Sequence, residues 1–309
     1  MIAKKNITKV FFLFLFFHLI IWTIVPSISN TNLPLDTIEA LAWGSNLEWG
    51  FNKHPPFSGF AVEVFYKIFG ANDWAYYLLS QLFVIVAFIY VWKLSNEIFE
   101  DRIYSLLSIL SISGIYFYNF TTPEFNVNVS QIPFWALTIY FFWKGINTKN
   151  ITNWILFGIF SALGFLSKYL FIYILFSIFI YFILNIKRYK KYIANYILSV
   201  AISFVILIPH LVWLFKNNFV TIFYGLNRSS LIESTWINHL ENPLIFIINQ
   251  IIILIPFLIM IFFLFKKLNF KFNFKNRKTL FLISINLIPI ALILITSILS
   301  GAKIRTMWM

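Results

Sequence analysis

The sequence predicts an all-α polytopic membrane protein with about nine transmembrane helices and a long first outer loop that carries short interfacial helices. Its 309 residues are 60% hydrophobic and only 11% charged, whereas charged residues make up about 25% of a soluble domain. Several apolar runs also approach the length of about 20 residues that crosses the hydrocarbon of a bilayer. These observations exclude a soluble globular domain, a disordered chain and a collagen-like fibre.

Nine apolar runs are the predicted spans, at residues 10–26, 76–92, 104–120, 129–143, 153–167, 170–186, 192–215, 243–265 and 279–299. The fourth, fifth and sixth are short, and the stretch 153–186 could form a tight hairpin that breaks at Ser167-Lys168. The first run follows three lysines and has the general form of a secretory signal. Its apolar core of about 16 residues and the lack of a small-residue cleavage site instead favour a retained helix.

The distribution of basic residues predicts the orientation of these spans. Alternate loops place seventeen of the 24 Lys and Arg residues on one side of the membrane and seven on the other. Short cytoplasmic loops collect Lys and Arg, so we expect a cytoplasmic N-terminus in the inner (plasma) membrane. The basic runs at 187–191 and 266–278 are then topology signals, and no nucleic-acid partner is expected.

The first outer loop, residues 27–75, is the longest stretch outside the predicted spans. It holds five of the eleven acidic residues and several Trp and Phe residues, among them Trp43, Trp49, Phe51, Phe57, Phe60 and Phe65. A long loop in a compact protein is usually functional or disordered, and its aromatic content argues against disorder. We expect short helices that lie on the outer membrane surface.

Two acidic residues of this loop, Asp36 and Glu39, have two interpretations. Asp36 follows Pro34 and precedes a helix-like run, so Asp36 and Glu39 could form a capping box that only starts a surface helix. Residues three apart also share a helix face, so both carboxylates could point to one place. Trp43 and Leu47 would then form an apolar wall on the same side.

Lys53 and His54 could return toward the two acids after a break at Gly50. A carboxylate can act as general base on an acceptor hydroxyl, and an adjacent ammonium group can stabilise a departing phosphate. The phosphate of a polyprenyl lipid would lie at this depth, with its tail in the bilayer.

These residues resemble the first-loop signature of a known family. The pattern Asp-x-x-Glu-x-x-x-Trp-Gly, followed by Gly-aromatic-x-Lys-His-Pro-Pro, is similar to that of GT-C glycosyltransferases, in particular the dolichyl-phosphate-mannose-protein mannosyltransferase-like family with its lipid A aminoarabinose transferases. Weaker similarities occur at residues 122–128, 164–169, 209–213 and 303–308.

The resemblance implies one transmembrane domain over residues 1–309, with residues 27–75 as its catalytic loop. It implies an enzyme that moves a sugar from a polyprenyl-phosphate donor to a lipid, glycan or protein acceptor on the non-cytoplasmic face. Asp36 matches the family's catalytic acid and Lys53 its phosphate-contacting lysine. Many members have adjacent Asp and Glu, whereas Thr37 follows Asp36 here, so Asp36 and Glu39 both stay candidates and we favour Asp36.

Family members usually continue beyond the point where this sequence stops, at Met309. A C-terminally truncated and inactive member is therefore one alternative. A second alternative is a transporter or flippase for a lipid or polyanion, but few polar residues lie deep in the predicted spans (His18, Gln131 and Gln250).

Further candidate substrate-binding residues lie on the same outer side. Glu124 and Asn126 could bind sugar hydroxyls or form a plain polar loop. Lys168, followed by Tyr169, could contact the phosphate or be a lysine that snorkels to the surface at a helix end. Arg228 could pair with a phosphate, although a solvated charge is the default.

The sequence assigns no cofactor, and a divalent metal stays an alternative. His54, His210 and His239 could join the acids in a divalent metal site, but the sequence has no histidine spacing typical of one, so no metal ligand is assigned. Nucleotide-binding glycine motifs are absent as well. The expected partners are a polyprenyl-phosphate sugar donor, a lipid or glycan acceptor and membrane lipids.

Overall fold

The computed structural model describes residues 4–229, 235–265 and 273–304, and within these ranges it is helical with no β-strand. The predicted all-α fold is therefore confirmed. The helices are α1 (Lys4–Ser29), α2 (Leu35–Gly44), α3 (Phe57–Phe69), α4 (Asp73–Phe99), α5 (Arg102–Ser113), α6 (Val127–Asn147), α7 (Ile151–Ser167), α8 (Ile172–Leu184), α9 (Ile186–Tyr189), α10 (Ile193–Lys216), α11 (Val220–Arg228), α12 (Asn238–Phe265) and α13 (Arg277–Ser300). Three 3₁₀ turns, η1 (Tyr116–Tyr118), η2 (Tyr169–Phe171) and η3 (Lys190–Tyr192), connect some of them.

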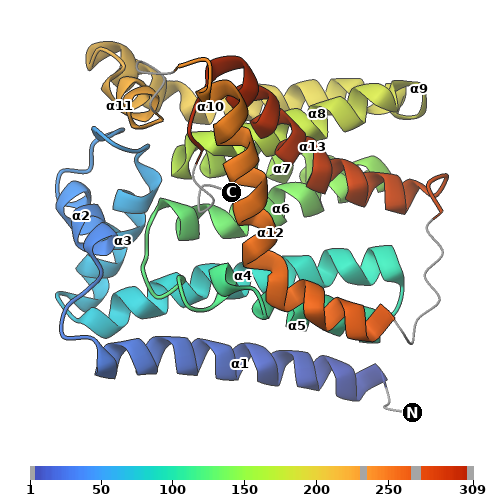
Figure 1. The fold of residues 1–309 in the computed structure, drawn as a ribbon, viewed down its shortest axis with the longest axis horizontal. Helices are drawn as coiled ribbons and strands as arrows, with labels where there is room; N and C mark the ends of the chain where they lie inside the picture. The colour runs from blue at the N-terminus through green and yellow to red at the C-terminus, as the bar shows by residue number, and fades with distance from the viewer. Residues whose placement is uncertain (1–3, 230–234, 266–272, 305–309) are drawn as a thin grey trace.

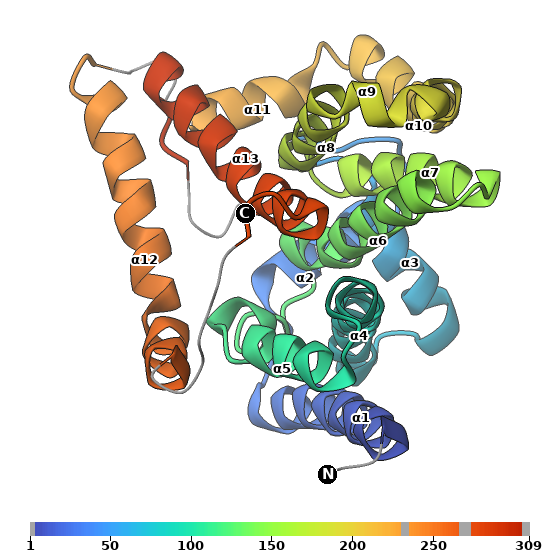
Figure 2. The same ribbon diagram turned by 90° about the vertical axis from the view of Figure 1, so that its right-hand side faces the viewer.

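Most long helices lie roughly along one common axis. The short helices α2, α3 and α11 lie together at one end of them (Figure 1). Figure 2 shows α12 at the periphery, alongside α13. Each predicted span overlaps a described helix. Within the described ranges, five segments are long and apolar enough to cross a membrane: Asn6–Ser29, Asp73–Phe99, Ile186–Lys216, Asn238–Phe263 and Arg277–Ser300. The protein is thus a polytopic membrane protein, and the number nine stays a prediction.

The third predicted span is the one that differs most from its helix. We expected residues 104–120, but α5 ends at Ser113. Asn119 folds back so that its side-chain amide donates to the Ser113 carbonyl at 2.6 Å. This bond satisfies an end carbonyl that a longer helix would have used, and the chain then continues through η1.

The predicted hairpin break at Ser167-Lys168 is confirmed. Helix α7 ends at Ser167, and Lys168 has an extended backbone with φ −162° and ψ 132°. The chain turns back closely enough that the Phe171 ring lies against Gly164, where a Cβ would come within 2.3 Å of ring carbons. Helices α6, α7, α8 and α13 then share a buried aromatic core around Phe142, Trp154 and Phe281.

The expected short helices of the first outer loop are α2 and α3. They cross so closely that a Cβ on Gly44 would lie 2.6 Å from the carbonyl oxygen of Gly59. The buried Thr37 hydroxyl donates to the carbonyl of Phe125 at 3.1 Å, which ties α2 to the segment before α6. These contacts fix the face of α2 that carries Asp36 and Glu39.

Candidate active site

The predicted acids do share one face of α2. Asp36, Glu39 and Trp43 line one small cavity together with His54, Ser58 and Asn126. The capping interpretation of Asp36 is wrong, because α2 begins at Leu35 after Pro34 and no side chain caps it. The apolar wall is Trp43 without Leu47, which follows the helix at a φ of 47° and is 46% exposed.

Lys53 lies beside Glu39, as the sequence predicted. Its ammonium group donates to a carboxylate oxygen of Glu39 in a half-buried ion pair. This hydrogen bond is the main reason that the pKa of Lys53 is raised above its usual value. Lys53 therefore stays a cation, and Glu39 has a partner that Asp36 lacks among the described salt bridges.

His54 lies on the cavity wall, where its ring meets the Trp43 ring edge-on at a centroid distance of 5.7 Å. Burial lowers its pKa to about 3, and the positive charges of Lys168, Arg228 and Lys53 add to the shift. Since charge acts over a limited range, these three cations lie near His54. The structure thus brings Lys168 and Arg228, which are distant in the sequence, near Lys53 and His54.

Glu124 and Asn126 connect α2 to the start of α6. The Asp36 backbone N–H donates to Glu124 Oε1 at 3.2 Å, and Asn126 caps α6 by accepting from the N–H groups of Asn128 and Val129. Burial and the nearby charge of Asp36 raise the pKa of Glu124. Both residues are therefore held in place rather than lying in a loose polar loop.

Lys168 does not snorkel to the surface. Only 7% of it is exposed, and its ammonium group donates to the side-chain oxygen of Asn128. Burial between α7 and η2 lowers its pKa to about 7. This lysine is buried near His54, because the chain turns back sharply after α7.

Tyr169 has a supporting position. Its hydroxyl lies 2.9 Å from Nε2 of the buried His210, and His210 Nδ1 lies 2.5 Å from the carbonyl oxygen of Trp49. A carbonyl only accepts, so Nδ1 carries the proton and Nε2 accepts from Tyr169. This chain of bonds joins η2 and α10 to the first outer loop.

Gly50 lies flat against Trp213 of α10. A Cβ at Gly50 would come within 2.3 Å of the indole ring, and the indole N–H donates to Glu48 at 2.9 Å. Nearby, the Thr221 hydroxyl of α11 donates to the Phe51 carbonyl at 2.6 Å. The segment that carries Lys53 and His54 is therefore braced by both α10 and α11.

Comparison with known sequences identifies the family. Residues 53–213, just over half of the chain, match the sequence profile of the family described as dolichyl-phosphate-mannose-protein mannosyltransferase. The chain belongs to this family. A similar protein is the lipopolysaccharide core galacturonosyltransferase RgtA of Rhizobium johnstonii, which is 18% identical over 189 residues. That stretch is 60% of this chain and 38% of RgtA. No solved structure matches the chain significantly.

The mannosyltransferase-family match includes only part of the candidate site. Lys53 and His54 stand at its start, and Glu124, Asn126, Lys168 and Tyr169 lie within it. Asp36 and Glu39 precede it, and Arg228 follows it. Arg228 is an exposed residue at the end of α11, where it bonds the Tyr224 hydroxyl. In the motif at 303–308, Lys303 N donates to Ser229 O at 3.0 Å, and Arg305 and Trp308 lie outside the described residues.

A second cavity of about 240 Å³ adjoins the first at Asn126. Polar groups of Glu124, Asn128 and Gln131 line it, together with apolar and aromatic residues that include Tyr118 and Trp135. Gln131 is anchored there, because its side-chain oxygen accepts from the Trp135 indole at 3.3 Å. Amide groups beside aromatic rings suit a ligand that has both hydroxyls and an apolar face.

Ser58 is a site residue that the sequence analysis missed. It is the second residue of α3 and only 1% exposed. Its hydroxyl finds no hydrogen-bond partner among the described residues, and no side chain caps α3. A buried unpaired hydroxyl is rare enough to need an explanation. The sequence signal was its position just after Pro55-Pro56, where a helix could begin.

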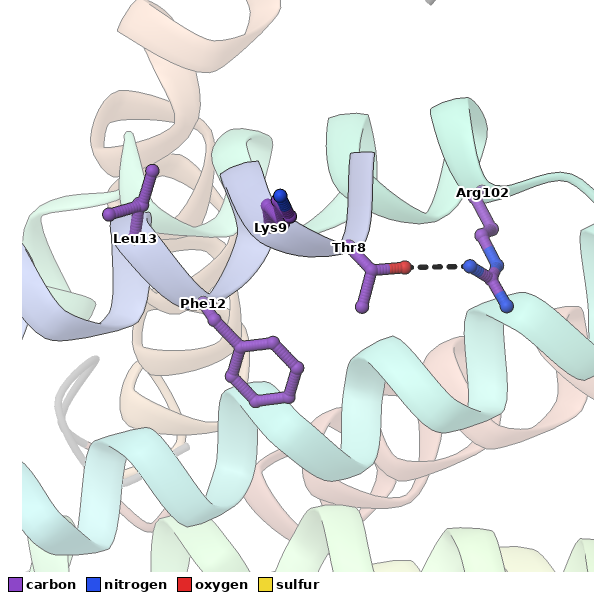
Figure 3. Close-up of a pocket in the computed structure, with 5 residues that line it drawn as sticks. All are labelled: Thr8, Lys9, Phe12, Leu13 and Arg102. Carbon is purple, nitrogen blue, oxygen red and sulfur yellow. Dashed lines mark hydrogen bonds between the residues drawn. The ribbon is translucent and has the colours of Figure 1, made fainter. Parts of the chain in front are cut away.

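A further large cavity lies at the opposite end of the bundle, between α1 and α5 (Figure 3). Its lining residues include no acid, so it offers no general base. In the described parts of the chain, no three His, Asp or Glu side chains converge as a metal site would require.

Proposed function

We propose that this member of the mannosyltransferase family transfers a sugar from a polyprenyl-phosphate donor to an acceptor hydroxyl on the non-cytoplasmic face of the inner membrane. The observation that carries the proposal is the convergence at one cavity. Two carboxylates from α2 meet His54, Asn126 and Ser58 there, and three cations lie near His54. The residues come from three separate segments, which is typical of a built site.

The arrangement supports the two halves of a sugar transfer. Asp36, as general base, takes the proton from an acceptor hydroxyl while that oxygen attacks the anomeric carbon of the sugar. The bond from the anomeric carbon to the phosphate oxygen breaks, and the configuration inverts. The departing phosphate gains negative charge, which Lys53, Lys168 and Arg228 stabilise.

We assign the base to Asp36 rather than Glu39. Glu39 is engaged by the Lys53 ammonium group. Among the described residues, the hydrogen bond that joins Asp36 to Glu124 is made by the backbone N–H of Asp36 and not by its carboxylate. The Glu39–Lys53 pair then holds the phosphate-contacting lysine at the cavity.

The adjoining cavity is the proposed sugar site. Its volume of about 240 Å³ is in the range of one sugar ring, and its amides can bond hydroxyls while Trp135 packs against the ring. The relative RgtA is named for transfer of galacturonic acid to the lipopolysaccharide core. By analogy, we propose a cell-envelope lipid or glycan as the acceptor here.

The direct test replaces Asp36 with Asn. Loss of the base should reduce sugar transfer by a factor of about 10² to 10⁴ while the protein level in membranes is unchanged. Transfer is read by mass spectrometry of envelope lipids and glycans from a deletion strain that carries each variant. Asp73→Asn serves as control, since Asp73 is also an exposed acid, at the first residue of α4.

Two outcomes would count against this assignment. Full transfer by Asp36→Asn with loss in Glu39→Gln would move the base to Glu39. Identical envelope profiles with and without the wild-type gene would contradict sugar transfer itself.

A further inference from the structure

The cavity opposite the candidate site combines a basic rim with an apolar floor. It has a volume of about 590 Å³ and is lined by Thr8, Lys9, Phe12 and Leu13 of α1 and by Arg102 of α5. Figure 3 shows the Arg102 guanidinium facing the Thr8 hydroxyl across the gap between the two helices. The cavity therefore lies between two helices, near the ends that carry their basic residues.

The guanidinium has a fixed position in this cavity. Arg102 Nη1 donates to Thr8 Oγ1 at 2.8 Å. A guanidinium carries five N–H donors in a planar fork and matches phosphate oxygens well. The bond to Thr8 orients the guanidinium in the cavity, and the exposed Lys9 is next to Thr8 on α1.

The acids near this cavity are engaged elsewhere. An adjoining cavity shares Thr8 and Arg102 and is also lined by Lys93, Glu97 and Glu100. Glu97 is paired with Lys144 at 2.6 Å, and Glu100 with Lys278. Asp101 accepts from the N–H of Ile103 as the cap of α5. The region therefore has a net positive charge, to which Lys9, Lys93 and Arg102 contribute.

The apolar side of the cavity continues into the membrane. Phe12 and Leu13 are 58% and 56% exposed, and Phe16 and Phe17, one turn further along α1, are exposed to the same degree. In a membrane-spanning helix such a surface contacts hydrocarbon. A soluble anion would contact only the basic residues, whereas a lipid would contact both the basic residues and the exposed apolar face of α1.

We propose that this cavity binds the phosphate headgroup of an anionic phospholipid, with an acyl chain along the exposed face of α1. Basic pockets between transmembrane helices are suited to such headgroups. Arg102 and Lys9 bind the phosphodiester oxygens, and Phe12 and Leu13 contact the chain. The site is independent of sugar transfer, since it lies at the other end of the helices.

The test is lipid binding by the full-length protein in detergent, measured by native mass spectrometry. Phosphatidylglycerol is titrated against phosphatidylcholine with the same acyl chains, and inorganic phosphate is the soluble-anion arm. The double variant Lys9→Gln/Arg102→Gln should bind phosphatidylglycerol about 25-fold more weakly, because each basic residue near an anionic headgroup contributes about fivefold. Phosphatidylcholine binding should fall much less, because the choline cation offsets the charge of its phosphate.

A matched control removes the same charge elsewhere. Lys187→Gln/Arg188→Gln neutralises two exposed basic residues beyond α8, and it should bind phosphatidylglycerol as the wild type does. Equal losses in both double variants would show a diffuse charge effect and overturn the site. Displacement of the lipid by inorganic phosphate at equal concentration would also overturn it, because the acyl chain would then contribute nothing.

A second measurement covers the case in which the double variant does not fold. A photo-crosslinking amino acid in place of Leu13, in an otherwise unchanged chain, should label phosphatidylglycerol in preference to phosphatidylcholine in mixed nanodiscs. Labelling of the two lipids in proportion to their abundance would contradict the proposal.

Discussion

His54 is a histidine whose surroundings oppose a positive charge. Burial and three neighbouring cations lower its pKa to about 3, so the ring is neutral throughout the physiological range. It can accept or donate one hydrogen bond to a substrate without adding charge. A bound phosphate would offset the three cations and thereby favour a proton on the ring.

This pKa predicts how stability depends on pH. An unfolded His54 takes up a proton near pH 6.5, whereas the folded one does so only near pH 3, so the folded state loses stability as pH falls below 6.5. The loss attributable to this residue is about 2 kcal/mol by pH 5. His54→Gln should therefore show a smaller drop in thermal midpoint between about pH 7.5 and about pH 5.

The measurement is thermal unfolding of the purified protein in detergent at the two pH values. His239→Gln, which alters a histidine of α12, should keep the wild-type pH dependence because His54 is still present. An equal pH dependence in His54→Gln and the wild type would show that His54 has the same pKa in the folded and the unfolded protein.

Replacing Ser58 should affect stability and sugar transfer in opposite directions. Its buried hydroxyl has no partner among the described residues, so its removal relieves the cost of an unpaired polar group. Ser58→Ala should be as stable as the wild type or more stable by about 1 kcal/mol, yet transfer sugar more slowly if that hydroxyl contacts substrate.

Unfolding and transfer assays on the same preparation test this pair of effects. Ser45→Ala is the control, because Ser45 is an exposed serine at the end of α2. Destabilisation of Ser58→Ala would mean that the hydroxyl has a partner in the folded protein. Unchanged transfer would remove Ser58 from the site.

At the scale of elements, the crossing of α2 and α3 positions the acids. Gly44 and Gly59 let the two helices approach until backbone meets backbone. The Gly59 carbonyl cannot move aside as a side chain can. The position of Asp36 and Glu39 at the cavity that His54 also lines thus depends on a missing side chain at the end of α2.

Gly44→Ala should therefore force α2 and α3 apart. Overpacking of this kind costs about 1–3 kcal/mol, and sugar transfer should fall as the acids move. Gly225→Ala in α11 is the matched control, since nothing lies within 4 Å of its Cβ position. There, alanine should stabilise the helix by up to about 1 kcal/mol.

Thermal unfolding and sugar transfer, measured for both variants, test whether the crossing of α2 and α3 positions the acids. If Gly44→Ala behaved like Gly225→Ala, the close crossing would not control the site.

The ends of elements were harder to predict than their existence. Apolar runs gave the approximate position of each span, because burial in hydrocarbon needs length and composition only. The end of α5 depended on a side-chain bond from Asn119 to Ser113, which hydropathy cannot indicate. Likewise, α2 begins one residue before Asp36, so a pattern that suits a capping box did not form one.

Most residues of the candidate site could be predicted from the sequence, because their positions follow from spacing along a short stretch of the chain. Spacing on one helix placed Asp36 with Glu39, and the chain reversal at Gly50 returned Lys53. The inward position of Lys168 and the unpaired hydroxyl of Ser58 depend on packing between distant segments. Such contacts leave no local pattern in a single sequence.

At the scale of the whole molecule, the charge asymmetry predicts which end faces the cytoplasm. The chain has no cysteine, so a thiol reagent can label only a cysteine that is introduced, and its accessibility shows on which side of the membrane that residue lies. Asn46→Cys, in the exposed first loop, should react with a membrane-impermeant maleimide applied to spheroplasts. Lys187→Cys, an exposed residue at the other end, should react only after the membrane is opened.

Gel shift after labelling reads out both variants, and each is the control for the other. The reverse pattern would invert the predicted topology and place the candidate site in the cytoplasm.

The contact between Gly50 and Trp213 constrains how relatives of this protein can diverge. Any side chain at position 50 would occupy the space of the indole ring, so such a change is tolerated only when residue 213 becomes smaller. We therefore expect paired substitutions at these two positions among homologues, although 162 residues separate them in the numbering. A family alignment would then record this loop and α10 as a single evolutionary unit.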